Sequence, residues 1–112
     1  MRDDHERLLD MLEALHKIEQ YVHSESESVL LENNELVEIW VIHHLQIIGE
    51  AASRISDVFR ANHPEVAWGG IIGMRHVLVH GYFETDKDIV WKVVERDLPS
   101  LKVQLQKILS AD

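Results

Sequence analysis

Residues 35–59 read ELVEIWVIHHLQIIGEAASRISDVF, and two neighbouring apolar rows run along this stretch. The first row consists of Val41, Leu45, Ile48, Ala52, Ile55 and Phe59, and the second of Leu36, Trp40, Ile47, Ala51 and Val58. Their spacing is typical of an amphipathic α-helix. We therefore predict one long helix that Asn33 and Asn34 can cap, that continues to about Ala61, and that Pro64 stops.

The double row also has a consequence for the position of this helix. One partner helix cannot cover both rows, so we expect the helix to lie at the centre of the fold. Gly49, Ala51 and Ala52 are small enough to let another backbone approach closely. A second subunit is one candidate for that neighbour, and we expect a homodimer.

Similar spacing predicts further helices over residues 3–22 and 85–109. A third, shorter helix is expected over residues 67–80. Thr85 and Asp88 resemble a capping box that opens the last of these helices. Pro99 is expected to kink that helix or to divide it after Leu98. No stretch alternates with the period of a strand, so we predict a single domain over residues 1–112. Its fold class is all-α, an up-and-down bundle of four to five helices.

Three glycines in residues 67–80 need an explanation. Gly69, Gly70 and Gly73 each cost a helix about 1 kcal/mol relative to alanine. We expect tight packing of these glycines on a neighbouring element to offset this loss of helix stability. Gly81 follows as a residue that can end the helix in the left-handed conformation.

Composition excludes several classes of function. The 112 residues include no cysteine, which rules out disulfides, zinc–thiolate sites and thiol catalysis. The apolar runs are too short to cross a bilayer, so we expect a soluble cytoplasmic protein without a membrane partner. The net charge of −9 argues against DNA binding and against a general nucleic-acid coat. That acidity is confined to residues 1–50, which leaves room for an anion-binding site in the rest of the chain.

The residues that best suggest chemistry lie between positions 72 and 83. Arg75, His80 and Tyr82 supply a permanent cation, a group that titrates near neutrality and a phenol. Cleavage of RNA by its own 2′-hydroxyl needs proton transfer, which histidine provides, and stabilisation of the phosphate oxygens, which arginine provides. On an ideal helix Arg75 and His80 lie about 140° apart. Two copies that meet across a dimer axis would bring such groups into one cleft.

A metal site is a competing interpretation of the same segment. His76 and His80 are four residues apart, which places both imidazoles on one face of a helix. A third ligand is missing, because there is no HExxH motif and Glu84 and Glu50 are only candidates. We therefore predict no metal and no other cofactor.

Five segments carry a resemblance to a known family. They are IGEAASRI (residues 48–55), PEVAW (64–68), GMRHVLVHGYF (73–83), DIVW (88–91) and DLP (97–99). In order and spacing they resemble the HepT-like toxins of the HEPN superfamily. The resemblance implies a small helical homodimer that cuts RNA without a metal and is encoded beside a minimal nucleotidyltransferase antitoxin.

The same resemblance implies roles for individual residues. The family signature is arginine, four to six residues, histidine, one residue and tyrosine, and Arg75, His80 and Tyr82 fill these places. Arg75 and His80 are thus implied to be catalytic, and Tyr82 to be the tyrosine that the antitoxin modifies with AMP. Where the family often has asparagine, this chain has His76, which either supports the site or faces solvent. Glu50 is implied to orient Arg75, with an ordinary salt bridge as the alternative.

The sequence supports three hypotheses. The first is a metal-independent endoribonuclease toxin whose partners are RNA, a second copy and the antitoxin. The second is a noncatalytic helical dimer that binds, and is modified by, a nucleotidyltransferase, which suits the acidic N-terminal half. The third is a metal-dependent hydrolase that uses His76 and His80.

Overall fold

The computed structural model describes residues 3–22, 35–80, 90 and 92–111. For residues 21–22, 35–38 and 76–80 it describes the backbone but not the side chains. Five α-helices and one π-helical turn form the described chain. They are α1 (Asp4–Val22), α3 (Glu35–Ser53), α4 (Asp57–Asn62), α5 (Trp68–His80), the π-helical turn η2 (Val93–Asp97) and α7 (Leu98–Ala111). Within this part of the chain there is no strand, so the predicted all-α bundle is confirmed.

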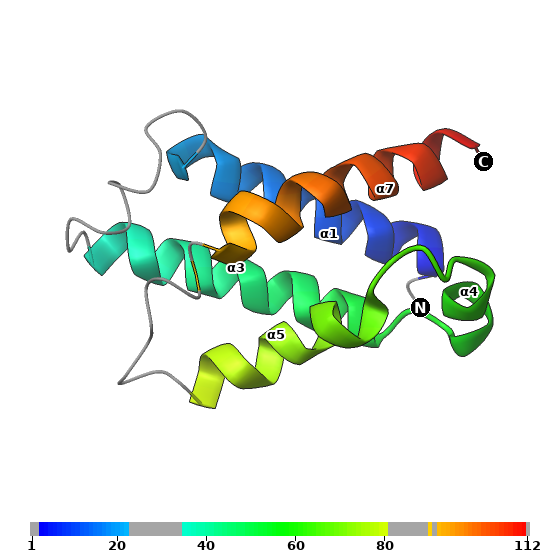
Figure 1. The fold of residues 1–112 in the computed structure, drawn as a ribbon, viewed down its shortest axis with the longest axis horizontal. Helices are drawn as coiled ribbons and strands as arrows, with labels where there is room; N and C mark the ends of the chain where they lie inside the picture. The colour runs from blue at the N-terminus through cyan, green and yellow to red at the C-terminus, as the bar shows by residue number, and fades with distance from the viewer. Residues whose placement is uncertain (1–2, 23–34, 81–89, 91, 112) are drawn as a thin grey trace.

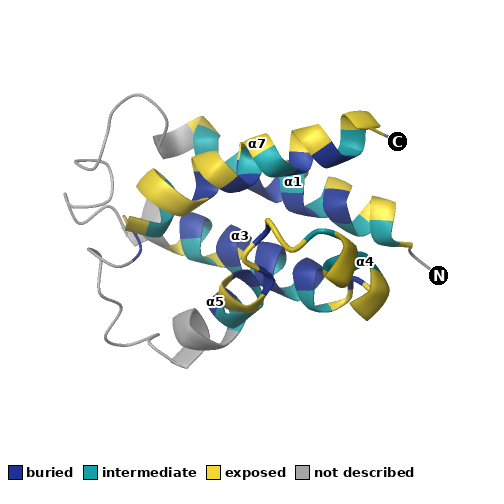
Figure 2. Ribbon diagram, turned by 45° about the vertical axis from the view of Figure 1, so that its right-hand side comes forward, coloured by how far each residue is buried: buried dark blue, intermediate teal, exposed yellow. Residues whose placement is uncertain are grey.

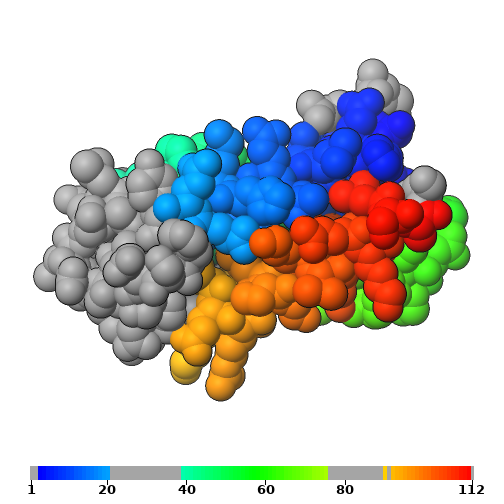
Figure 3. Space-filling view, turned by 90° about the horizontal axis from the view of Figure 1, so that it is seen from above, coloured from blue at the N-terminus to red at the C-terminus, as the bar shows by residue number. Residues whose placement is uncertain are grey.

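Helix α3 is the central element. It contacts α1 on one side and α5 on the other, while α7 packs on α1 (Figure 1). Seen from above, α1 and α7 lie side by side and cover one face of the molecule (Figure 3). A salt bridge of 3.1 Å between Lys102 Nζ and Glu19 Oε1 joins these two helices. Both apolar rows of α3 thus have neighbours in the same chain, and the double row does not by itself require a second subunit.

The core lies where these four helices face one another (Figure 2). Each helix presents the stripe that its spacing predicts, because residues three and four apart return to the same face. The largest fully buried side chains are Leu8, Met11, Leu15, Ile18, Val41, Leu45, Ile48, Ile55, Val90 and Leu105.

The predicted long helix is in fact two helices. Helix α3 ends at Ser53, where the amides of Arg54 and Ile55 bond to carbonyls three residues back, and α4 begins at Asp57. Ser56 starts the new helix as its N-cap, with its hydroxyl accepting from Phe59 N–H. The prediction of one continuous helix to Ala61 was wrong because it weighed apolar spacing alone and missed this cap.

A long-range contact fixes the break. Asp4 accepts hydrogen bonds from Ser56 N at 2.8 Å and from Ser56 Oγ at 2.7 Å, which ties the start of α1 to the start of α4. Ile55, inside the break, is buried, whereas Val58 is 72% exposed on α4. The first apolar row therefore reaches the core through Ile55 and, beyond the break, through the partly buried Phe59, whereas the second row ends with α3.

The C-terminal part of the chain follows the prediction closely. Val90 is buried, and Leu98, Leu101, Leu105 and Ile108 form the buried stripe of α7. The division expected after Leu98 is not found, because the π-helical turn ends at Asp97 and continues directly into α7, which begins at Leu98 and includes Pro99. The change of helix type lies just before Pro99, which lacks the N–H donor of a regular helical turn. The predicted cap at Thr85 and Asp88 and the Gly81 stop lie outside the described residues.

Two tryptophans hold neighbouring segments together. Trp40 Nε1 donates to the Lys17 carbonyl at 2.9 Å and so connects α3 to α1. Trp68 is buried and donates to the His63 carbonyl at 2.9 Å. Both indoles thus serve as packing and hydrogen-bonding groups within the fold. Among the described helices, none is long and apolar enough to span a membrane.

We expect Ser56→Ala to lower the free energy of unfolding by about 1 kcal/mol, since the variant loses the N-cap of α4 and the hydroxyl bond to Asp4. Urea denaturation followed by circular dichroism measures this loss. Ser110→Ala is the matched control, because the Ser110 hydroxyl bonds only to the Lys107 carbonyl at the exposed end of α7. Equal stability of the two variants would show that Ser56 is not a structural cap.

Candidate active site

The structure places two of the predicted site residues beside each other. Glu50 lies in the last turn of α3, and Arg75 lies in the middle of α5. The backbone of α5 continues through His76 and His80, but their side chains, and all of Tyr82, lie outside the described part of the chain. The geometry therefore bears on Arg75 and Glu50, while the roles of His76, His80 and Tyr82 stay predictions.

Gly49 allows α3 and α5 to cross closely at this point. A Cβ atom added to Gly49 would lie 2.9 Å from Arg75 N, 3.1 Å from Arg75 Cβ and 3.1 Å from the Ile71 carbonyl oxygen. Real Cβ atoms do not approach backbone atoms at such distances, so only glycine fits without a shift of the helices. The close backbone approach expected at Gly49 is confirmed, and the neighbour is α5 of the same chain.

The glycines of α5 itself behave differently from the prediction. A Cβ atom on Gly69, Gly70 or Gly73 would meet nothing within 4 Å. The expectation that they pack tightly on a neighbour was wrong, because the tight contact at this helix pair is made by the glycine of α3. Nothing in the described structure requires glycine at these three positions.

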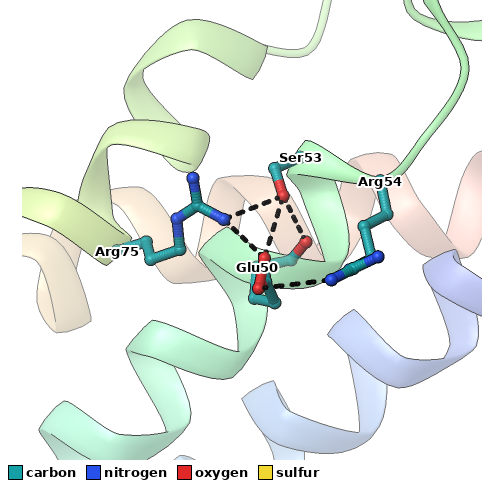
Figure 4. A network of polar contacts seen from close by, with 4 residues as sticks. All are labelled: Glu50, Ser53, Arg54 and Arg75. Carbon is teal, nitrogen blue, oxygen red and sulfur yellow. Dashed lines mark hydrogen bonds and ion pairs between the residues drawn. The ribbon is translucent and has the colours of Figure 1, made fainter.

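A network of polar contacts surrounds Arg75 (Figure 4). Arg75 Nη1 donates to Glu50 Oε2 at 2.5 Å and to Ser53 Oγ at 3.4 Å. Ser53 Oγ in turn lies 2.6 Å from the Glu50 carbonyl oxygen and 3.1 Å from Glu50 Oε2. On the other side of the carboxylate, Arg54 Nη2 lies 3.8 Å from Glu50 Oε1. One carboxylate and one hydroxyl thus set the orientation of the Arg75 guanidinium.

Sequence analysis missed Ser53, although a signal was present. Ser53 follows Glu50 by three residues, the spacing that puts two side chains on one face of a helix. Arg54 follows Glu50 by four residues and contacts it on the same face of α3. Asp57 pairs with Arg60 on α4, because the chain turns before Asp57.

The charges of this network favour the ionised carboxylate. The hydrogen bond from Arg75 is the main cause that holds the pKa of Glu50 below its usual value, and burial opposes that effect. The side chains of Arg75 and Glu50 remain 34% and 43% exposed. Solvent therefore weakens their attraction, and the ion pair acts mainly to position Arg75.

A cavity of about 520 Å³ opens beside this network. Helix α1 lines it with Arg7, Asp10, Glu13, Ala14 and Lys17. Helix α3 lines it with His43, His44, Gln46, Ile47, Glu50 and Ala51, and α5 contributes Arg75. Of the adjacent histidines, His43 is exposed and His44 is buried, because neighbouring residues on a helix point in different directions.

The arrangement suits binding of an anion at Arg75. A guanidinium presents planar donors that match the oxygens of a phosphate, and Glu50 holds it in one orientation beside an open cavity. In the described part of the chain no three histidine, cysteine, aspartate or glutamate side chains gather as metal ligands. The predicted pair His76 and His80 falls outside that search.

Known proteins resemble this chain over most of its length. The family described as "Ribonuclease HepT-like" matches residues 11–108. The chain is 36% identical over 110 residues to "Probable ribonuclease HepT" of Thermococcus cleftensis, with 96% of each chain covered. It is 33% identical over 105 residues to "Putative RNase MJ1380" of Methanocaldococcus jannaschii, covering 94% of this chain and 95% of that one. No solved structure matches the chain significantly. The matched region includes the crossing of α3 and α5.

We expect Gly49→Ala to lower the free energy of unfolding by about 1–3 kcal/mol, since the new methyl group overpacks the helix crossing. Gly70→Ala is the matched variant on α5, where the methyl group meets open space. It should raise stability by about 0.5–1 kcal/mol through better helix propensity. Chemical denaturation of both variants measures the two effects, and a Gly49→Ala variant as stable as Gly70→Ala would contradict the close crossing.

Glu50→Gln should reduce stability at neutral pH, by less than about 1 kcal/mol because solvent reaches both partners of the pair and screens their attraction. The pKa of Glu50 is lowered in the folded state, so its stabilising effect is complete above the unfolded pKa and is lost as pH falls through the folded one. The difference between the wild type and Glu50→Gln should therefore shrink as pH falls from 7 to 3. Unfolding curves across this range measure it, with Glu95→Gln on η2 as the exposed control.

Proposed function

The chain belongs to the HepT-like ribonuclease family, and from this premise we propose that it is a metal-independent endoribonuclease. The observation that carries the proposal is the position of Arg75, which Glu50 and Ser53 orient at the edge of a cavity. The curated relatives named as ribonucleases match nearly the whole chain, which supports an RNA substrate.

In the proposed reaction the 2′-hydroxyl of a ribose attacks the adjacent phosphorus, and the 5′-oxygen of the next nucleotide leaves. His80 transfers the proton, and Arg75 binds the phosphate oxygens as negative charge develops on them. His76 supports the site as the polar residue next to Arg75. The products are a 2′,3′-cyclic phosphate and a 5′-hydroxyl, so no water is consumed in this step.

A homodimer is part of the proposal. Arg75 and His80 are five residues apart on one helix and do not face the same direction at that spacing. Two protomers that pair near the C-terminal end of α5 would place one guanidinium and one imidazole from each around the same phosphate. The scissile linkage would then lie between the subunits.

We also propose that the enzyme is the toxin of a toxin–antitoxin pair in the cytoplasm. Its partner would be a minimal nucleotidyltransferase that transfers AMP from ATP to the Tyr82 hydroxyl with release of pyrophosphate. The phosphodiester formed adds bulk and negative charge seven residues from Arg75 and disfavours an anionic substrate.

A second candidate function is a noncatalytic helical dimer that only binds such a nucleotidyltransferase. The observation that favours it is the confinement of the negative charge to residues 1–50, which suits association with a protein better than capture of RNA. The two functions differ in whether the purified protein cuts RNA.

Incubation of the purified protein with mixed RNA in the presence of a chelator tests the proposal. The wild type should produce cyclic 2′,3′-phosphate ends, and His80→Ala should lower the cleavage rate about 10²- to 10⁴-fold. Arg75→Lys should also lose activity, because a lysine keeps the charge but not the planar fork. Arg96→Lys, an exposed arginine on η2, is the matched control.

Each outcome of this experiment selects one hypothesis. Loss of cleavage on addition of the chelator would favour the metal-dependent hydrolase that uses His76 and His80. A complete absence of cleavage by the wild type would favour the noncatalytic dimer. Full activity of His80→Ala would remove His80 from the mechanism.

A further inference from the structure

The cavity between α1 and α3 extends well beyond Arg75. Its volume of about 520 Å³ is in the range of sites that hold small molecules. Ala14, Ile47 and Ala51 contribute apolar surface, and polar side chains of both helices surround them. The cavity thus has room and surface for a ligand larger than the phosphate that Arg75 alone would bind.

His44 is the buried polar group of this cavity. It is only 5% exposed, and its Nδ1 lies 2.7 Å from the Trp40 carbonyl oxygen. A carbonyl can only accept, so Nδ1 carries the hydrogen and Nε2 is an acceptor in the neutral ring. Among the residues that the structure describes, Nε2 has no hydrogen-bond partner. Because His44 lines the cavity, a ligand N–H group could take the place of solvent at this acceptor.

The charges that line the cavity indicate what kind of ligand fits. Arg7 and Lys17 of α1 face a cavity that also contains the carboxylates of Asp10, Glu13 and Glu50. With Arg75 included, three basic side chains face three carboxylates, so the charges of the cavity cancel. The cavity therefore does not favour a polyanion along its whole length. A ligand with one anionic end at Arg75 and a neutral body matches this distribution.

The separation of Glu50 and His44 along α3 indicates how long that ligand is. Glu50, which contacts Arg75, and His44 are six residues apart on the same helix, which is about 9 Å along its axis. This is the length of a nucleotide from the edge of its base to its phosphate. The face of a base can pack on the partly exposed side chain of Ile47, beside the buried Ala14 and Ala51, and its N–H groups suit His44 and the carboxylates.

From these observations we propose that the cavity between α1 and α3 binds a nucleobase of single-stranded RNA, with His44 Nε2 accepting a hydrogen bond from a base N–H. The phosphate adjacent to that base then lies at Arg75. The inference rests on the proposed ribonuclease function and adds to it a subsite that selects the base beside the cut. His44 is a binding residue in this scheme and takes no part in proton transfer.

Nuclear magnetic resonance of the histidine side chains tests the subsite without any substitution. Wild-type protein labelled with ¹⁵N is titrated with GMP, AMP, CMP and UMP, and separately with inorganic phosphate. At least one nucleotide should move the Nε2 resonance of His44 and leave that of His16, an exposed histidine of α1, in place. Phosphate alone should leave His44 unchanged. The proposal fails if no nucleotide moves His44 or if phosphate moves it as much.

A pair of variants gives a second measurement. In His44→Asn the amide N–H takes the place of Nδ1–H toward the Trp40 carbonyl, while the Nε2 acceptor is lost. The Kd of the best nucleotide should rise about 3- to 10-fold, the effect of one hydrogen bond. His16→Asn is the matched control and should bind like the wild type. Equal Kd values for His44→Asn and the wild type would overturn the proposal.

Cleavage of a random RNA pool separates this inference from the function on which it rests. If both are right, the wild type cuts with a base preference next to the cut that His44→Asn weakens. If the wild type cuts but shows no nucleotide contact at His44, only the subsite is wrong. If nucleotides bind at His44 but no RNA is cut, the ribonuclease function is wrong.

The NMR experiment also distinguishes a second copy of the chain from a nucleotide. A His44 signal that changes with protein concentration and not with nucleotide would assign the cavity to a second copy, against the proposal.

Discussion

The close crossing of α3 and α5 is the constraint on which the candidate site depends. At Gly49 the two backbones approach so closely that a methyl group has no room. This contact fixes the rotation and the register of α5 against α3, because interlocked helices cannot slide past one another freely. It also places Arg75 opposite Glu50 and Ser53, so the orientation of the guanidinium follows from backbone packing.

Much of the fold could be predicted from the sequence, because helical periodicity is a local property. The apolar stripes of α1 and α7 were readable from residues three and four apart. The break between α3 and α4 was not readable in this way. It depends on Ser56 as a cap and on Asp4, which lies 52 residues away in the sequence, and periodicity carries no information about such a contact.

Only part of the candidate site could be predicted from the sequence. Arg75 and Glu50 were named from chemistry and resemblance, and their contact confirms the pairing. Ser53 and His44 were missed as site residues because serine and histidine on a helix are ordinary, and only the three-dimensional structure places one beside Arg75 and the other in a cavity. The open space around the glycines of α5 could not be predicted, because it depends on how the neighbouring helices are placed in three dimensions.

The ion pair between Glu50 and Arg75 has a consequence for which anions can occupy the site. Glu50 is a competitor fixed in place, and its effective concentration near Arg75 far exceeds that of a small ion in solution. A free inorganic anion offers charge alone and must displace this carboxylate without other contacts. A phosphate on a polymer strand that is already bound to neighbouring surfaces competes with Glu50 better, because it too is present at a high effective concentration. The carboxylate therefore disfavours small free anions at the guanidinium more than it disfavours a phosphate held in place by other contacts.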